Sequence, residues 1–182
     1  MVLRRIFILA LVLAAATTLM SKEDHSAFSF QKTDYFHRWS QGTQHEFTPA
    51  KQEDLDHWAD MITINVYPDV DDGEKLAGSA NAVLENYRSH QGKILKTSSV
   101  PATDEKPAEH FIVVRFNQPD FVEVAFARFK LVEDKGHSFV YSHRVYGDKA
   151  IEEMNAWITA NGEKTEHALL DWNPPADATS RR

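Results

Sequence analysis

Two histidines and two arginines on neighbouring predicted strands are the residues of this chain that could form a site. A predicted meander turns between Gln118 and Pro119 and again near Lys135. Antiparallel pairing across these two turns places His110 opposite Ala127, and Ala127 opposite His143. Two imidazoles separated by two strand spacings, roughly 10 Å, are wide apart for two ligands of one metal ion but can line a polar notch for a small ligand. A bulge in the middle strand would bring Arg128 beside His143, and Arg144 follows directly. The predicted ligand-binding residues are His110, Arg128, His143 and Arg144.

The bulge is expected because the apolar face of the middle strand changes parity. Val122 and Val124 alternate with polar residues, but beyond Phe126 the apolar residues move to the other parity, at Ala127 and Phe129. A strand with one extra residue switches faces in this way, which predicts a bulge near Phe126 and Ala127. The alternative to a ligand site is a purely structural role, in which the two histidines lie at the edge of the core and bond to the backbone.

A second polar cluster consists of Asp54, Asp56, His57 and Asp60. Carboxylates and imidazoles at such spacing can bind a divalent cation, but calcium loops need a longer run of oxygen ligands and a glycine at the turn. Neither is present. The cluster is therefore predicted to be a solvated acidic turn, and no metal site is predicted.

Motifs for nucleophilic catalysis and nucleotide binding are missing from the sequence. No G-x-S-x-G, H-E-x-x-H, P-loop or dinucleotide fingerprint occurs. Ser142 and His143 are successive strand residues, so their side chains point to opposite faces and form no dyad. The chain has no cysteine, which excludes thiolate chemistry, disulfides and an amino-terminal lipid anchor. No catalytic residue and no cofactor are predicted.

The elements that must position the histidines belong to an antiparallel sheet. Three apolar, β-branched and aromatic runs between Glu109 and Gly147 are separated by turn signals at Asn117–Asp120 and Glu133–Gly136, which predicts a three-stranded meander. Regular alternation of apolar and polar residues predicts another strand over Asp60–Tyr67. Further strands are predicted at 27–30, 45–49 and 94–100.

Two amphipathic helices are predicted to cover this sheet. The first is capped by Asp72 and stopped by Gly92, and its apolar residues recur at helical spacing. The second is capped by Asp148 and ends at Asn161–Gly162, with one or two further turns over 165–172. The fold class is therefore α+β, an antiparallel sheet with a C-terminal three-stranded meander and two main helices packed on it.

The start of the chain predicts export. Arg4 and Arg5 precede the apolar run Ile6–Ala16, which ends in small residues as a signal peptide does. The run is shorter than the roughly 20 residues of a transmembrane helix, although an uncleaved anchor remains an alternative. We expect a signal peptide over 1–16, or to 20, a single domain over 27–172, a disordered tail over 173–182, and a periplasmic or secreted bacterial protein.

Charge narrows the range of partners. The chain carries 27 acidic and 20 basic residues, and cleavage would remove two of the basic ones. A protein this acidic repels the phosphates of nucleic acids and the surface of anionic membranes. We therefore expect neither nucleic-acid binding nor any membrane contact beyond the signal peptide or anchor.

Three stretches resemble a family of exported proteobacterial proteins with no characterised activity: Asp54–Asn65 (DLDHWADMITIN), Pro107–Val113 (PAEHFIV) and Tyr141–Gly147 (YSHRVYG). The likeness covers most of the chain after its leader and implies a genuine domain, but no activity. The element order is also similar in layout to the Mog1/PsbP-like fold. Members of that fold are mostly accessory or binding proteins, so this resemblance implies binding rather than catalysis.

The sequence thus predicts an exported, non-catalytic binding or accessory domain. It would present one sheet face or helix edge to a protein or small-molecule partner that the sequence does not identify. The alternative is a small hydrolase or metal-assisted enzyme that uses the histidine and arginine row on the sheet.

Overall fold

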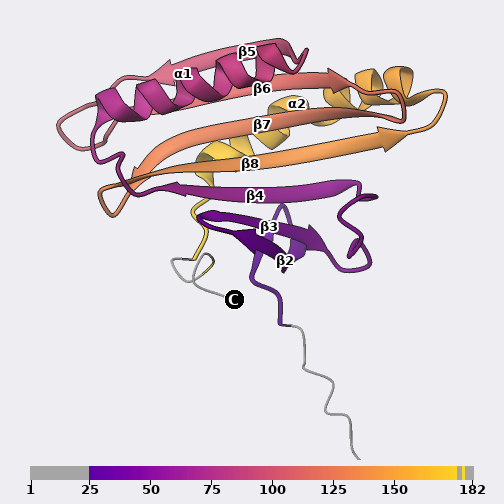
Figure 1. Cartoon of the computed structure of the whole chain (residues 1–182), viewed down its shortest axis with the longest axis horizontal. Coiled ribbons are helices and arrows are strands. Elements are labelled where there is room, and N and C mark those ends of the chain that lie inside the picture. The colour runs from indigo at the N-terminus through magenta and orange to yellow at the C-terminus, as the bar shows by residue number, and fades with distance from the viewer. Residues whose placement is uncertain (1–24, 176–177, 179–182) are drawn as a thin grey trace, which may run out of the picture.

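A computed structural model describes residues 25–175 and 178, and the described chain forms one eight-stranded sheet with two long helices (Figure 1). In chain order the elements are β1 Phe28–Phe30, β2 Thr33–Gln41, β3 Gln44–Pro49, β4 Asp60–Tyr67, α1 Gly73–Ser89, β5 Lys93–Val100, β6 Glu109–Asn117, β7 Phe121–Val132, β8 Lys135–Tyr146 and α2 Ala150–Asp171. The α+β class is therefore confirmed.

Every pair of neighbouring strands in the sheet is antiparallel. The strand order is β1-β2-β3-β4-β8-β7-β6-β5, so β8 leaves the predicted meander to pair with β4, while β5 forms an edge. Helix α1 connects β4 to β5 and lies in front of the sheet in Figure 1, whereas α2 lies behind it. Helix α1 thus covers β5, β6 and β7 on one face, and α2 covers β7 and β8 on the other.

Coverage of both faces explains the composition of β7, where a bulge was predicted. Val124 and Phe126 belong to the core under α2, whereas Ala127 and Phe129 belong to the core under α1. The pairings of β7 with β6 and with β8 are regular throughout. The bulge prediction was wrong, because a strand buried on both sides carries apolar residues at both parities.

The registers of the meander also differ from those predicted. His110 faces Phe129 and His143 faces Val124, while Ala127 faces Ile112 and Val140. Both errors arise from the position of the turn centre. Moving a turn centre along the chain shifts every cross-strand pair by twice that distance, and the pairs differ by two residues between β6 and β7 and by three between β7 and β8.

The β7–β8 turn shows why its centre was misplaced. Glu133 and Asp134 take the left-handed φ values of +48° and +57°, as the two central residues of a type I′ turn do. Gly136, expected in the turn, instead lies in β8 opposite Tyr67, and Val70 packs where its Cβ would be. The glycine therefore serves close packing against the β4–α1 connection.

Helix α1 begins and faces the sheet as the sequence predicts. The Asp72 carboxylate accepts a hydrogen bond from the Lys75 amide at 2.8 Å and caps the helix. Leu76 and Ala80 are buried against the sheet. Burying such an apolar stripe stabilises the docked helix by roughly 1.5–3 kcal/mol for each large side chain.

Helix α2 is longer than predicted, because it continues through Asn161 and Gly162 to Asp171. The residue before it, Lys149, makes no side-chain capping bond, so the predicted Asp148 cap was also wrong. A mid-helix glycine costs only about 1 kcal/mol. Burial of Thr165 and Leu169 beyond it outweighs that cost.

Strand β2 was not predicted, and its geometry explains why. Its pairing with β3 shifts between His37 and Trp39, so that Arg38 is an extra residue in a β-bulge. Residues on either side of the bulge do not follow a single alternating pattern. The aromatic residues here therefore show no clean period in the sequence.

The ends of the chain lie partly outside the described residues. The predicted signal peptide falls outside them, as do residues 176–177 and 179–182 of the predicted tail. Within that tail, Asn173 accepts a hydrogen bond from Lys130 at 2.9 Å, and Ala178 is buried in the core under α2. Among the residues described, no helix combines the length and apolarity that a membrane span requires.

Gly136 generates a stability prediction. A Cβ at this position would lie 2.6 Å from Cγ1 and 2.8 Å from Cβ of Val70, so Gly136→Ala should destabilise the fold by about 1–3 kcal/mol. The matched control is Gly78→Ala in α1, where a Cβ meets nothing within 4 Å. That change should stabilise the protein by about 0.5–1 kcal/mol. Urea unfolding measures both, and equal effects would contradict the role assigned to Gly136.

Candidate functional site

The structure separates the four residues predicted to form a ligand site. His143 lies on the sheet face under α2, in line with Phe139 and Tyr141, whereas His110 lies on the opposite face in line with Ile112. Arg128 shares the α2 face with His143 but pairs with Phe139, four residues along β8 and therefore about 13 Å away. The predicted row is not formed, and whether any of its members binds a ligand stays a prediction.

Arg128 is a buried residue that holds the C-terminal end of α2. Its side chain forms two parallel bonds with Glu109, from Nε to Oε2 at 2.7 Å and from Nη2 to Oε1 at 2.9 Å. Its Nη1 donates to the carbonyl oxygens of Leu169 at 3.0 Å and Trp172 at 2.8 Å. The last turn of α2 contains no basic residue, so Arg128 supplies from the sheet the cation that stabilises this helix end.

Arg144 is also fully engaged within the chain. Its Nε donates to Oε2 of Glu123 at 2.7 Å, and its guanidinium lies between the rings of Trp58 and Phe121, at 3.9 and 4.1 Å from their centroids. Such stacking suits the planar guanidinium. The residue joins β7, β8 and the segment before β4.

His110 lies beside the edge strand β5. Its Nδ1 is 2.9 Å from the hydroxyl oxygen of Ser99, while the buried Nε2 has no hydrogen-bond partner among the described residues. Burial lowers the pKa of this imidazole, because the charged form loses hydration. His110 is therefore an uncharged residue at the edge of the core near pH 7.

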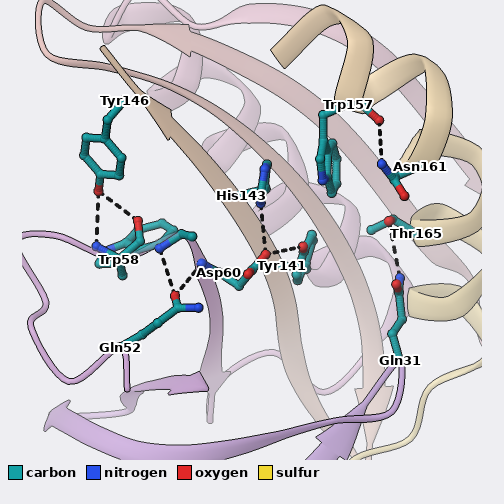
Figure 2. Close-up of polar contacts among 11 residues, drawn as sticks. Gln31, Gln52, Trp58, Asp60, Tyr141, His143, Tyr146, Trp157, Asn161 and Thr165 are labelled. Carbon is teal, nitrogen blue, oxygen red and sulfur yellow. Dashed lines mark hydrogen bonds and ion pairs between the residues drawn. The ribbon is translucent and has the colours of Figure 1, made fainter. Parts of the chain in front are cut away.

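His143 is the predicted residue with the most organised surroundings (Figure 2). Its Nδ1 donates to Oδ1 of Asp60 at 2.9 Å, and Tyr141 donates to the same oxygen at 2.7 Å. The imidazole stacks on Trp157 of α2, with ring centroids 4.2 Å apart and planes 12° apart. Asp60 is directly opposite His143 in the β4–β8 pairing.

The backbone around Asp60 is held by a second group of polar contacts (Figure 2). The side-chain oxygen of Gln52 accepts hydrogen bonds from the amides of Ala59 and Asp60, both at 2.8 Å. The Tyr146 hydroxyl donates to the carbonyl of Trp58 at 2.8 Å and accepts from its amide at 3.1 Å. These bonds fix the start of β4 and, through it, the direction of the carboxylate.

Asp60 is ionised despite its surroundings. Burial alone would raise the pKa of its carboxyl, but hydrogen bonds from His143, Tyr141 and Gln52 outweigh burial, and the pKa lies below its ordinary value. Burial, followed by the charge of Asp60, raises the pKa of Tyr141. The phenol therefore remains a proton donor.

The pair of Asp60 and His143 orients one imidazole but does not complete a catalytic centre. A carboxylate bonded to Nδ1 leaves Nε2 as the nitrogen that could accept a proton or bind a ligand. In residues 25–175 no hydroxyl is hydrogen-bonded to His143, and no group of three or more His, Cys, Asp or Glu side chains could hold a metal ion. The arrangement is best explained as a polar link between β4, β8 and α2.

Asp60 and Trp157 are the partners of His143 that the sequence analysis missed. Asp60 was assigned to a solvated turn with Asp54 and Asp56, yet it has the parity of Ile62 and Ile64 in a strand that was predicted. That parity was the available signal, because it sets the carboxylate on the core-facing side. Trp157 lies within the second predicted helix, but nothing local indicated its contact with His143.

The arrangement of elements defines an α+β protein, and two solved structures of Mog1 proteins are similar to it at low identity. A structure of a mutant of Protein Mog1 shares 12% identity, with 75% of this chain and 82% of that chain covered, at a TM-score of 0.46. The Saccharomyces cerevisiae Ran-binding protein Mog1p shares 13% identity, with 74% and 78% covered, at a TM-score of 0.43.

A protein-family model matches residues 25–170, and the chain belongs to that uncharacterised family. No curated protein matches the sequence. The predicted membership of an uncharacterised family is therefore confirmed.

The buried ion pair of Arg128 and Glu109 leads to a stability prediction. Arg128→Met leaves a partly buried carboxylate and two helix-end carbonyls unpaired, so it should lower the free energy of unfolding by about 3–5 kcal/mol. Lys130→Met is the control, since Lys130 lies on the same face but bonds only to Asn173; it should cost about 1 kcal/mol or less. Urea denaturation measures both, and similar losses would refute the role of Arg128.

The lowered pKa of Asp60 leads to a pH-dependent prediction. The ionised Asp60 carboxylate contributes fully to stability above the ordinary carboxyl pKa of 3.8. This contribution disappears as the pH falls through the lower pKa that Asp60 has in the folded protein. Asp60→Asn should therefore cost about 1.5–3 kcal/mol at pH 7, and the loss should shrink below about pH 4. Urea unfolding between pH 7 and pH 3 tests this, with Asp56→Asn as an exposed control. A pH-independent loss would rule out the charge as its cause.

Proposed function

We propose that the chain is an exported, non-catalytic binding domain that presents an uncovered sheet surface to a protein partner. The surface, called here the open face, lies on the α1 side of β2, β3 and β4. It consists of Phe36, Trp39, Gln44, Glu46, Thr63 and Asn65. The observation that carries the proposal is the exposure of Trp39, which is 36% accessible on this face.

The open face exists because α1 covers only part of its side of the sheet. Helix α1 packs on β5, β6 and β7, and in Figure 1 it lies over the upper strands while β3 and β2 extend below it. Register places Trp39 beside Glu46, and Glu46 beside Thr63. These three side chains form one row, and none of them is buried.

The residues of the open face suit a protein rather than a nucleic acid. Arg38 lies over the ring of Phe36, with the guanidinium carbon 5.3 Å from the ring centroid. Tryptophan and arginine are enriched among the residues that dominate protein–protein binding energies. Amide, hydroxyl and carboxylate groups surround Trp39 and can pair with a polar rim on the partner. The acidic balance of the chain opposes nucleic acids.

The hydrolase alternative loses its geometric support. It requires His110, Arg128 and His143 to act together, but the two histidines lie on opposite faces of the sheet. Arg128 is committed to Glu109 and to α2. Export is the other part of the proposal, and the basic and apolar residues at the start of the chain support it.

The proposal predicts a position-specific contact in cells. A photo-crosslinking amino acid at Thr63, on the open face, should give a discrete adduct with a protein in the periplasmic fraction. The same probe at Glu85, on the exposed side of α1, should not give that adduct. Trp39→Ala should weaken the adduct strongly, because loss of a central tryptophan costs at least about 2 kcal/mol, or roughly thirtyfold in affinity.

Two measurements complete this test. Urea unfolding should show that Trp39→Ala remains folded, because the side chain is exposed. Fractionation should locate the protein outside the cytoplasm. Adducts that form equally from both positions, or that do not respond to Trp39→Ala, would argue against the open face.

A further inference from the structure

Ser40 stands between two imidazoles on the side of the sheet opposite to the open face. Its hydroxyl oxygen is 2.6 Å from Nε2 of His37 and 2.8 Å from Nδ1 of His45. The ring centroids of the two histidines are 6.2 Å apart. Two ring nitrogens thus point at one small region of space.

The β2 bulge creates this convergence. In a regular strand, residues 37 and 40 would lie on opposite faces. The extra residue Arg38 puts them on the same face, and Ser40 pairs directly with His45 of β3. Bulges are frequent where a fold re-aims a side chain for function.

The two rings are held in place by the core beneath them. His37 meets Phe47 edge-on, with centroids 5.3 Å apart, and His45 is only 7% exposed. Ser40 itself is exposed and borders an open groove of about 920 Å³, which also includes Gly42, Thr43 and Lys135. The point between the imidazoles can therefore be reached from solvent while the rings stay fixed.

The tautomer of each ring decides which of its nitrogens can bind a ligand. The Ser40 hydroxyl has one proton and two lone pairs, so each of the two ring nitrogens can either donate to it or accept from it. In the tautomer that protonates the other nitrogen of its ring, each imidazole turns a lone pair toward the shared point.

We propose that His37 and His45 together bind a late first-row divalent metal ion, such as Zn²⁺ or Ni²⁺, at this point. With metal–nitrogen bonds of about 2.0–2.1 Å, two imidazoles on one tetrahedral ion have ring centroids about 5.2 Å apart. The two rings are 6.2 Å apart in the structure, and rotation of His37, the less buried ring, closes this difference. Ser40 provides an oxygen ligand or swings aside, and solvent or an exogenous ligand fills the remaining positions.

The donor set decides the class of metal. Imidazole suits zinc, nickel and copper, whereas magnesium and calcium require carboxylate and carbonyl oxygens, which do not take part in this cluster. Within residues 25–175 and 178 no set of three His, Cys, Asp or Glu side chains could hold a metal. The site therefore has two nitrogen ligands and keeps open positions, and the nearby Lys135 favours an anionic exogenous ligand.

Isothermal titration of the exported protein, purified without a histidine tag, tests this site. ZnCl₂ or NiCl₂ should bind with one ion per chain, and CaCl₂ should not bind. His37→Gln and His45→Gln should each weaken binding by about tenfold or more, as expected on loss of a ligand. Ser40→Ala should retain binding within about threefold, and His110→Gln and His143→Gln should leave it unchanged.

A second measurement does not depend on how well the variants fold. In the wild-type protein, Zn²⁺ should protect His37 and His45 from modification by diethyl pyrocarbonate, as read by mass spectrometry, while exposed His90 reacts as before. Absence of zinc binding at millimolar concentration, or unchanged affinity in the double His37→Gln/His45→Gln variant, would overturn the proposal. Trp39 borders the same groove, but metal binding is measured on the purified protein alone, so its outcome does not depend on whether a partner binds the open face.

Discussion

The buried guanidinium of Arg128 is the interaction on which the arrangement of the two halves of the chain depends. A charge that is 4% exposed must have its donors matched, and Glu109 together with the carbonyls of Leu169 and Trp172 matches them. One side chain thereby fixes β6, β7 and the end of α2 relative to one another. Trp172 then packs on Phe28 in β1, so the first strand takes its place from the same contact.

The other part of α2 is held by a different kind of link. Trp157 stacks on His143, which Asp60 orients from β4. The helix is therefore tied to the sheet in its first half by an aromatic stack on a hydrogen-bonded imidazole, and at its end by a buried cation. The polar residues that first suggested a ligand site mostly perform this structural work. The surfaces left for recognition lie elsewhere, on the open face around Trp39 and beside the bulge at Ser40.

Much of the fold could be predicted because its signals are local. Alternation over Asp60–Tyr67, the cap at Asp72 and the apolar runs of the meander each depend on residues close together in sequence. Registers could not be predicted in this way. The β7–β8 turn is formed by Glu133 and Asp134 rather than by Gly136, and that choice follows from Val70 packing on the glycine, a contact between distant segments.

The sequence by itself determined most of the element types, the α+β class, the absence of thiol chemistry and the acidic balance, because period and composition are properties of short windows and of totals. Only the tertiary structure decided which face each polar residue occupies and which residue it meets. Arg128 and Trp172 are 44 positions apart, and Asp60 and His143 are 83 apart. No local pattern encodes such pairs, since they arise only when turn centres, a bulge and two helices set the strands in register.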